Sequence, residues 1–480
     1  MAKKTSRLLI LMMTCVYASL APSCTCRKET NGCDLINVPS LNQSETSALN
    51  SKSFSASDWP QSQWWSLFED DQLSALIESG RSENYSIKQA ESRLRQAYAL
   101  VDQSKSKFYP NVNLQIDDQW IHQSKNGLFG PFFNTYSVFE IIFNFFFDID
   151  LWGKNRGRYN AMLSRVQTMQ AEVHQTDLIV STSVAATYFD MMQTHALLEI
   201  YKEQLATQSE LTAILKERYR KGLDDEFAVI ASEEEAMNIQ TSIANLENKL
   251  ELSRHLLATL TGQGPDELNL MTHFTAQMEK PFAIPENISS NLLVHRPDIK
   301  AQLWLTEALA FEAGVANAGY YPDLNIAALA GFQSLQFDQI FRSRSLTASL
   351  WPTLTLPIFT AGSINATINV ANAEYEEAAM VYNELILKAV QEVADAISTA
   401  RSVDKQLSLQ DLALVKSLKT IKLTVALVNN NIQDERAILE ARQSFLDQKK
   451  MWVPLYYQRL IAALQLIKSM GGGYFQEGVP

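Results

Sequence analysis

The side chains that most often carry catalysis and bind metals, histidine and cysteine, are few in this chain and poorly placed for either task. The six histidines lie far apart, and no two have a metal-binding spacing such as HExxH. They are His122, His174, His195, His255, His273 and His295. The nucleophile pattern GxSxG does not occur, and the glycine-rich stretch 470–474 lacks the strand, spacing and lysine of a phosphate loop. We therefore expect no enzyme, no cofactor and no metal site.

The four cysteines, Cys15, Cys24, Cys26 and Cys33, all lie in the first 33 residues, which leaves no disulfide framework for the body of the chain. A basic start, MAKKTSR, and a short apolar run precede SLAPSC, so residues 1–23 are expected to be a signal peptide. The small residues before Cys24 resemble a lipoprotein processing site and predict a lipid such as palmitate on Cys24. The alternative is that Cys24, Cys26 and Cys33 are ordinary thiols of the tail, with Cys26 bonded to Cys33.

Size and charge narrow the class of protein further. The 480 residues are too many for one ordinary core, and the net charge of −12 without a basic patch argues against nucleic acid as a partner. Residues 24–56 are polar and rich in serine and threonine, as expected of a lipid-anchored tether. Beyond the signal, no run of about 18 apolar residues occurs, so no transmembrane helix is predicted.

The elements that must position any functional residue occur twice. SIKQAESRLRQAYALVDQSKSKFYPNVNLQI (86–116) aligns without a gap with DIKAQLWLTEALAFEAGVANAGYYPDLNIAA (298–328). Further along each half, 219–234 aligns with 428–443, and LWGKNR aligns with TAGSIN. Such repetition predicts two similar halves. We expect a first repeat at 57–263, a linker at 264–297, a second repeat at 298–470 and a flexible C-terminus at 471–480.

Four segments alternate between apolar and polar residues over lengths of about 10–13 residues, which suits tilted strands that cross hydrocarbon. They are 112–120, 139–151, 324–332 and 346–358. The more common meaning of such alternation is a soluble hairpin that packs on helices, and this alternative stays open. Four strands cannot close a barrel, and open strand edges are not tolerated in lipid, so several copies would have to assemble. Three copies would supply twelve strands.

Two long segments have the pattern of helices. Residues 158–220 and 366–428 lack proline and repeat apolar residues every three or four positions, as coiled-coil-like helices do. About 63 helical residues would span roughly 95 Å. The expected fold is therefore an α+β membrane protein. Its duplicated halves would supply four transmembrane strands and long helices per chain.

Polar residues at the two predicted helix reversals are the main site candidates. Gly222 and Asn431 occupy matching positions, and both residue types tolerate a left-handed backbone. Asp225 and Asp434 follow, where a carboxylate can cap the returning helix. A separate set lies on the polar side of 139–151 and predicts a lumen that prefers cations: Glu140, Asp148 and Asp150.

The ordered motifs WW…LF, FDIDLWG, HRPDIKA, LPIFTAG and AVQEVADA and the C-terminal glycines resemble those of the outer-membrane efflux factors, the TolC-like channel proteins, in their lipid-anchored branch. The resemblance covers nearly all of the mature chain. It implies a homotrimer that forms a 12-strand barrel in the outer membrane, continued by a helical barrel through the periplasm. It also implies partners: outer-membrane lipid, a periplasmic adaptor and an inner-membrane pump.

By the same resemblance, rings of side chains close the periplasmic end, and the matching positions here are Arg436 and Glu440. A salt link between these two residues, one helical turn apart, is our hypothesis for this gate. The chain departs from the family at Val428, where a tyrosine is usual, although Tyr219 keeps it in the first half. The alternative function is a lipid-anchored periplasmic adaptor or a structural coiled-coil protein of the envelope.

Overall fold

The computed structural model describes most of the chain. The described residues are 35–36, 38–41, 45–46, 48, 54–56, 58–124, 126, 135–267, 282–284, 288, 292 and 295–474. The predicted signal peptide, Cys24 with the other cysteines, most of the tether, much of the linker and residues 475–480 lie outside them.

The elements follow each other in nearly the same order in both halves. The first half contains α3 (Asp71–Glu83), α4 (Tyr85–Ser106), β2 (Asn111–His122), β3 (Thr135–Ile149), α5 (Lys154–Arg220) and α6 (Glu226–Leu260). The second contains α8 (Pro297–Asn317), β5 (Asp323–Ser334), β6 (Leu346–Thr355), α9 (Ser363–Asn429) and α10 (Arg436–Ser469). The helices α5 and α9 have 67 residues each, so the sequence repeat is also a structural repeat.

Short elements complete the chain. β1 (Phe54–Ala56) pairs in parallel with β4 (Phe282–Ile284). Short 3-10 helices occur at η1 (Trp64–Phe68), η2 (Ala318–Tyr320), η3 (Phe337–Gln339) and η4 (Ser343–Ser345).

Residues of both halves form each of two compact units. The sheet unit is built mainly from Arg93–Gln170 and Ala301–Asn383, and the helical unit from Ile36–Ser92, Ala171–Lys300 and Glu384–Pro480. The repeats are therefore not separate domains. The physical reason is that strands and helices of one half pair with their counterparts from the other half.

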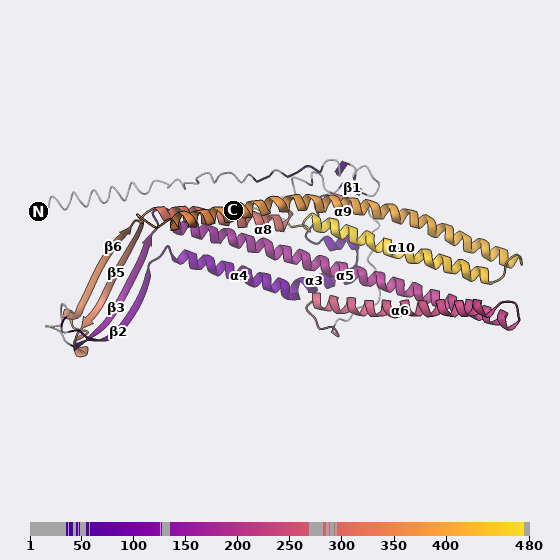
Figure 1. Ribbon diagram of the computed structural model, residues 1–480, viewed down its shortest axis with the longest axis horizontal. Coiled ribbons are helices and arrows are strands. Elements are labelled where there is room, and N and C mark those ends of the chain that lie inside the picture. The colour runs from indigo at the N-terminus through magenta and orange to yellow at the C-terminus, as the bar shows by residue number, and fades with distance from the viewer. Residues whose placement is uncertain are drawn as a thin grey trace. The chain divides into compact units, whose positions relative to one another are not determined.

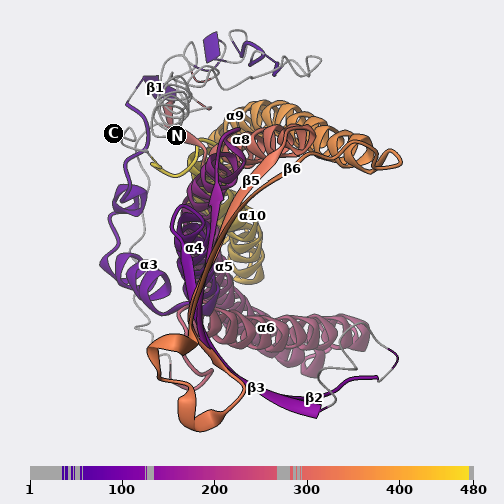
Figure 2. The same ribbon diagram turned by 90° about the vertical axis from the view of Figure 1, so that its left-hand side faces the viewer.

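In the sheet unit, four antiparallel strands pair in the order β2-β3-β5-β6. They run side by side and bow in the same direction (Figures 1 and 2). The central pair, β3 with β5, joins the two halves. Gly331 lies at this pairing because a Cβ there would overlap the backbone of Ile141.

In the helical unit, the core forms around the aromatic residues that the sequence places before α3. Trp64 and Phe68 of η1 are buried with Phe189 of α5, and the rings of Phe68 and Phe189 lie 4.9 Å apart. Asp70 caps α3 by accepting a hydrogen bond from the Leu73 amide, and it also accepts one from the hydroxyl of Tyr188. The WW…LF motif thus supplies the packing that fixes α3 against α5.

A buried arginine ties the start of the second repeat to its end. Arg296 of the HRPDIKA motif bonds Asp298 at 2.6 Å and Glu392 of α9 at 2.8 Å. It also donates to the carbonyl oxygen of Ser469, the last residue of α10. Burial works against the charge of Arg296, but these two carboxylates outweigh it and raise its pKa.

Candidate functional site

The strand register places the four predicted apolar faces on one side of the sheet. One cross-strand row joins Leu114, Phe143, Ala330 and Ala348, each the direct partner of the next. The neighbouring rows are Val112, Phe145, Ala328 and Leu350, and Ile116, Ile141, Phe332 and Leu346. We call this side the apolar face. The expected amphipathic strands are confirmed, and their pairing makes the apolar face continuous.

Large side chains of the apolar face are exposed in the single chain. The exposed fraction is 68% for Ile116, 53% for Phe143 and 68% for Leu350. Soluble monomers rarely leave such a continuous apolar surface in contact with water. This face therefore requires an apolar environment or another apolar surface.

The opposite side of the sheet carries polar groups that bond to each other. The Asn144 side-chain amide donates to Gln115 on β2 at 2.9 Å, and Gln333 on β5 donates to Glu140. Ile142, which is buried, also lies on this side. We call it the polar face, because its amides and carboxylates satisfy one another across strands.

Two of the three predicted lumen acids belong to the polar face. Glu140 and Asp148 are residues of β3, and Asp148 lies opposite Asn325. The register adds an acid that sequence reasoning missed, because Asp117 of β2 is the direct partner of Glu140. Only the pairing of the strands reveals this proximity.

The expectation that Asp150 lies on the strand is wrong. β3 ends at Ile149, and the Asp150 carboxylate accepts hydrogen bonds from the backbone amides of Asn155 and Arg156. These amides belong to the first turn of α5, whose unpaired N–H groups and dipole favour an anion. Asp150 therefore terminates the strand and begins the helix.

The predicted end of the last strand is also wrong. β6 ends at Thr355 and does not continue to Ile358. Pro357 follows, and a proline cannot donate a ladder hydrogen bond. In the single chain β6, which contains Pro352, is an edge strand of the sheet.

The repeated aromatic-proline motif marks the junction between sheet and helices. The indole of Trp152 stacks on Tyr321 with ring centroids 4.8 Å apart, and its Nε1 donates to the carbonyl oxygen of Pro322. Lys154 then pairs with Asp323 at 3.1 Å. The strand–helix junction of the first half thus binds directly to the YYPD motif of the second half.

Both helix reversals use the same backbone motif. Gly222 and Asn431 have φ of 69° and 58°, the left-handed conformation that ends a helix. In each turn the next amide donates to a carbonyl of the last helical turn, Leu223 to Arg218 and Ile432 to Leu427, both at 2.9 Å. This is the Schellman arrangement. The turns join α5 to α6 and α9 to α10 (Figure 1).

The two candidate caps differ in detail. The Asp225 carboxylate accepts from the Ala228 amide at 3.0 Å, as an N-cap of α6 does. The Asp434 carboxylate accepts from the Arg436 amide at 2.7 Å, and the N-cap of α10 is Glu435, which makes no side-chain cap bond. Counted from the matching turn residues, α10 begins one position later than α6. The Asp434 carboxylate therefore accepts a hydrogen bond from the first backbone amide of α10.

Four charged residues link the two turns. Arg218 binds Asp224 at 2.6 Å, and Arg436 binds Asp434 at 2.8 Å. Each arginine also reaches the aspartate of the other turn, at 3.5 Å in both cases. We call Arg218, Asp224, Asp434 and Arg436 the turn cluster. Sequence reasoning identified Asp434 and Arg436 and missed the other two, although both lie within four residues of Gly222.

The turn cluster keeps its carboxylates ionised. The hydrogen bond from Arg218 is the main cause of the lowered pKa of Asp224, and the charge of Arg436 adds to it. Burial acts against ionisation of Asp434, but hydrogen bonds from the Arg436 side chain and backbone outweigh it and lower the pKa of Asp434.

The hypothesis of a salt link between Arg436 and Glu440 is wrong for the single chain. Among the described residues, the ion-pair partners of Arg436 are Asp434 and Asp224, and Glu440 is exposed one turn along α10. The physical reason is that the guanidinium, at the first residue of the helix, meets two carboxylates at the turns before it can reach along the helix.

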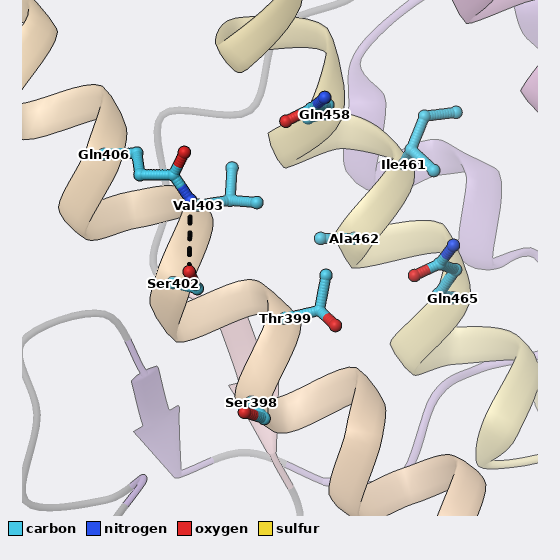
Figure 3. A pocket seen from close by; sticks show the side chains of 9 residues that line it. All are labelled: Ser398, Thr399, Ser402, Val403, Gln406, Gln458, Ile461, Ala462 and Gln465. Atoms are coloured by element: carbon cyan, nitrogen blue, oxygen red, sulfur yellow. Dashed lines mark hydrogen bonds between the residues drawn. The ribbon is translucent and has the colours of Figure 1, made fainter.

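The cavity between α9 and α10 contains no catalytic group. It has a volume of about 530 Å³, and serine, threonine, glutamine and small apolar residues line it (Figure 3). In the cavity wall, the side-chain amide of Gln406 donates a hydrogen bond to the hydroxyl of Ser402 at 3.1 Å (Figure 3). None of its lining residues is titratable near neutral pH, so it offers no acid, base or nucleophile pair.

Neither a metal centre nor a membrane-spanning helix occurs among the described residues. No group of three or more histidine, cysteine, aspartate or glutamate residues there could hold a metal ion. No helix there combines the length and apolar character needed to cross a membrane.

Known proteins are similar to this chain over most of its length. The family described as "Outer membrane efflux protein" matches residues 76–263 and 288–472. The multidrug resistance outer membrane protein MdtQ of Escherichia coli O6:H1 is 27% identical over 428 residues, which cover 87% of this chain and 89% of that protein.

Solved structures share the fold. The CmeC outer membrane channel of Campylobacter jejuni superposes with a TM-score of 0.83 at 22% identity, covering 88% of this chain and 90% of CmeC. The outer membrane protein VceC of Vibrio cholerae gives a TM-score of 0.79 at 26% identity, covering 86% of this chain and all of VceC (100%).

Proposed function

The chain belongs to the outer membrane efflux protein family and is an outer-membrane efflux channel rather than an enzyme, and from this premise we propose how it works. Three copies form one conduit. Their sheets close a 12-strand barrel in the outer membrane, and their long helices form a helical barrel in the periplasm. The conduit is passive, and a periplasmic adaptor and an inner-membrane pump supply cargo and energy.

The apolar face is the observation that carries this proposal. Four strands with one continuous apolar side and one hydrogen-bonded polar side suit a wall between lipid and water. One chain leaves β2 and β6 as open edges of the sheet, and backbone groups at such edges cannot stay unpaired in lipid. Pairing β6 of one copy with β2 of the next removes every edge.

The polar face would then line the lumen. Glu140 and Asp148 are the acids we assign to it, with Asp117 beside Glu140. Carboxylates around a water-filled pore favour cations over anions. The lipid on Cys24 would hold each copy at the inner leaflet of the outer membrane, independently of the strands.

The far end of the helical barrel would hold the gate. In a trimer Arg436 and Glu440 each occur three times about one axis, so like charges gather there and repel or recruit counter-ions. The turn cluster holds the two reversals of each chain together and would keep this end narrow. Opening would separate the two turns and break the pairs between them.

Fractionation of the envelope combined with conductance measurements tests the proposal. We expect the full chain in the outer-membrane fraction as an oligomer that resists SDS, and the purified oligomer should conduct ions in a planar bilayer. A Cys24→Ser variant should keep the oligomer and its conductance but lose the lipid modification detected by labelled palmitate. Recovery of the chain as a water-soluble monomer without conductance would refute the conduit.

A further inference from the structure

The loop that joins β5 to β6, residues 335–345, packs on the apolar side of the sheet. The ring of Phe337 lies 5.4 Å from that of Phe139, and the ring of Phe341 lies 5.8 Å from that of Phe332, both edge to face. Phe139 and Phe332 belong to the apolar side of β3 and β5. In Figure 2 the loop lies outside the curve of the sheet. We call residues 335–345 the rim loop.

The rim loop is held in shape by its own hydrogen bonds. The carbonyl oxygen of Gln339 accepts from the Arg342 amide at 3.0 Å and from the Ser345 hydroxyl at 2.8 Å. The Ser345 amide donates to the carbonyl oxygen of Arg342 at 2.9 Å, and Ile340 is buried. These contacts join η3 to η4, so the fold of the loop decides where its exposed side chains lie.

The rim loop exposes large apolar side chains although it is folded. The exposed fraction is 71% for Phe337, 72% for Phe341 and 53% for Leu335. Water is a poor surrounding for a group of such side chains. Since two of them contact the apolar face, they extend the surface that the proposed conduit places in lipid.

The last row of the apolar side before the rim loop contains polar residues. Phe139 has Asp118 on one side and Ser334 on the other, whereas the next row toward the helices is wholly apolar. In the proposed conduit this change marks the depth at which hydrocarbon gives way to lipid headgroups, where aromatic side chains gather. Phe337, which contacts Phe139, therefore lies at the level of the headgroups.

The headgroups at this level belong to the outer leaflet. β5 begins at Asp323, after α8 and η2, and ends at Ser334, where the rim loop begins. The rim loop therefore lies at the end of the sheet opposite the helices. Because the proposed conduit places the helices in the periplasm, this end faces the exterior. The outer leaflet there consists of lipopolysaccharide, a glycolipid whose lipid A portion carries phosphates at headgroup level.

The rim loop offers cations to such phosphates. Arg342 and Arg344 are exposed, and neither forms an ion pair within the part of the chain that the structure describes. Asp338 is the one acid in the sequence of the loop, which therefore has a net positive charge in a chain whose net charge is −12. The planar guanidinium of arginine matches phosphate oxygens with two parallel hydrogen bonds.

From the apolar contacts, the depth and the charge together we infer that the rim loop binds a phosphorylated glycolipid of the outer leaflet. Arg342 and Arg344 hold its phosphates, while Phe337 and Phe341 lie against the start of its acyl chains. The inference rests on the proposed conduit, which sets the depth and the leaflet. It assigns the loop a ligand that neither the barrel nor the gate requires.

Titration of the purified full-length oligomer with diphosphoryl lipid A tests the inference. Native mass spectrometry measures the bound lipid A in the presence of EDTA, so that bridging divalent cations are absent. Arg342→Gln with Arg344→Gln should raise the Kd at least tenfold. Arg158→Gln with Arg442→Gln removes two exposed arginines from the helices instead and should leave the Kd unchanged. A Kd equal to that of the parent in the rim-loop variant would overturn the inference.

The parent chain supplies a second measurement that needs no substitution. Monophosphoryl lipid A should bind at least tenfold more weakly than the diphosphoryl form, because it lacks one of the two phosphates. Phosphatidylglycerol, which has one phosphate and no sugar phosphates, should also bind more weakly. Equal binding of all three lipids would show attraction to any anionic lipid surface and would overturn the assigned site.

The phenylalanines separate a lipid from a free phosphate ion. Phe337→Ser with Phe341→Ser should weaken binding of diphosphoryl lipid A at least fivefold, and inorganic phosphate in tenfold excess should not displace it. Displacement by inorganic phosphate would show a simple anion site and contradict the inference. A parent oligomer that conducts ions but binds no lipid A would overturn this inference alone, whereas a parent chain that forms no conducting oligomer would refute the proposed function.

Discussion

At the scale of single residues, the turn cluster decides how the two reversals respond to pH. Asp224 and Asp434 have lowered pKa values, so both are ionised well below neutral pH. A carboxylate with a lowered pKa stabilises the folded arrangement above the ordinary aspartate pKa of about 3.9. That stabilisation is lost as the pH falls through the lowered value. Mild acid should therefore leave the cluster intact.

We predict that the closed-state conductance of the reconstituted channel stays constant from pH 8 to about pH 5 and rises only below about pH 4. Asp224→Asn should raise the conductance already at pH 7, because Arg218 loses its main partner and Arg436 loses its contact to the other turn. Glu217→Gln is the control, since among the described residues Glu217 forms ion pairs with Arg220 and Lys221 of its own helix end and with neither aspartate of the turn cluster. Opening between pH 7 and pH 5 would show that other groups control the gate.

At the scale of secondary structure, the effect of a substitution in the sheet depends on which side of the sheet the residue faces. Leu350 and Ser349 are neighbours on β6, but Leu350 opposes Ala328 on the apolar face and Ser349 opposes Leu329 on the other. The two positions therefore form a matched pair for testing which side meets lipid.

Leu350→Arg should prevent stable insertion, because an arginine on the lipid side near the middle of a bilayer costs about 2–4 kcal/mol. Three copies would multiply this penalty in the assembled barrel. Ser349→Arg should still insert and should change conductance, because its charge would enter the lumen. The measurement is the amount of SDS-resistant oligomer in the outer-membrane fraction. Equal amounts of oligomer from both variants would contradict the assignment of the faces.

At the scale of the whole molecule, ion selectivity follows from the acids that the assembled sheets would direct inward. We predict a cation-selective reversal potential in a salt gradient, and Glu140→Gln with Asp148→Asn should reduce it. Asp118→Asn is the control, because Asp118 lies on the apolar side of β2, next to Asp117. An anion-selective parent channel, or an effect of Asp118→Asn equal to that of the double change, would contradict the proposed lumen.

The sequence was sufficient to predict the strands and helix reversals whose residue pattern lies within one short stretch of the chain. Alternation along 112–120 and 324–332 predicted strands that the structure contains, and the duplicated turns at Gly222 and Asn431 predicted both reversals. The predicted end of the strand 139–151 was wrong, because two signals in the same stretch of sequence conflicted. The alternation continued past Ile149, but the first amides of α5 required the Asp150 carboxylate and ended the strand.

The turn cluster shows the limit of reasoning from sequence. Spacing within α10 favoured Glu440 as the partner of Arg436, because residues four apart share a helix face. The structure gives Arg436 two closer carboxylates, one of them more than two hundred residues earlier in the chain. No pattern within one stretch of the sequence predicts that Asp224 lies close to Arg436 in space.

By itself, the sequence determined the duplication, the amphipathic strands, the long helices and the residues that turn them. These follow from backbone geometry, which fixes a period of two or 3.6 residues for any stretch of chain. The tertiary structure alone decided that β3 pairs with β5, that four apolar faces form one surface, and that Arg218 and Arg436 each reach the aspartate of the other turn. Pairing between distant segments depends on how the whole chain packs, and its register is set only when the partner strand or helix is in place.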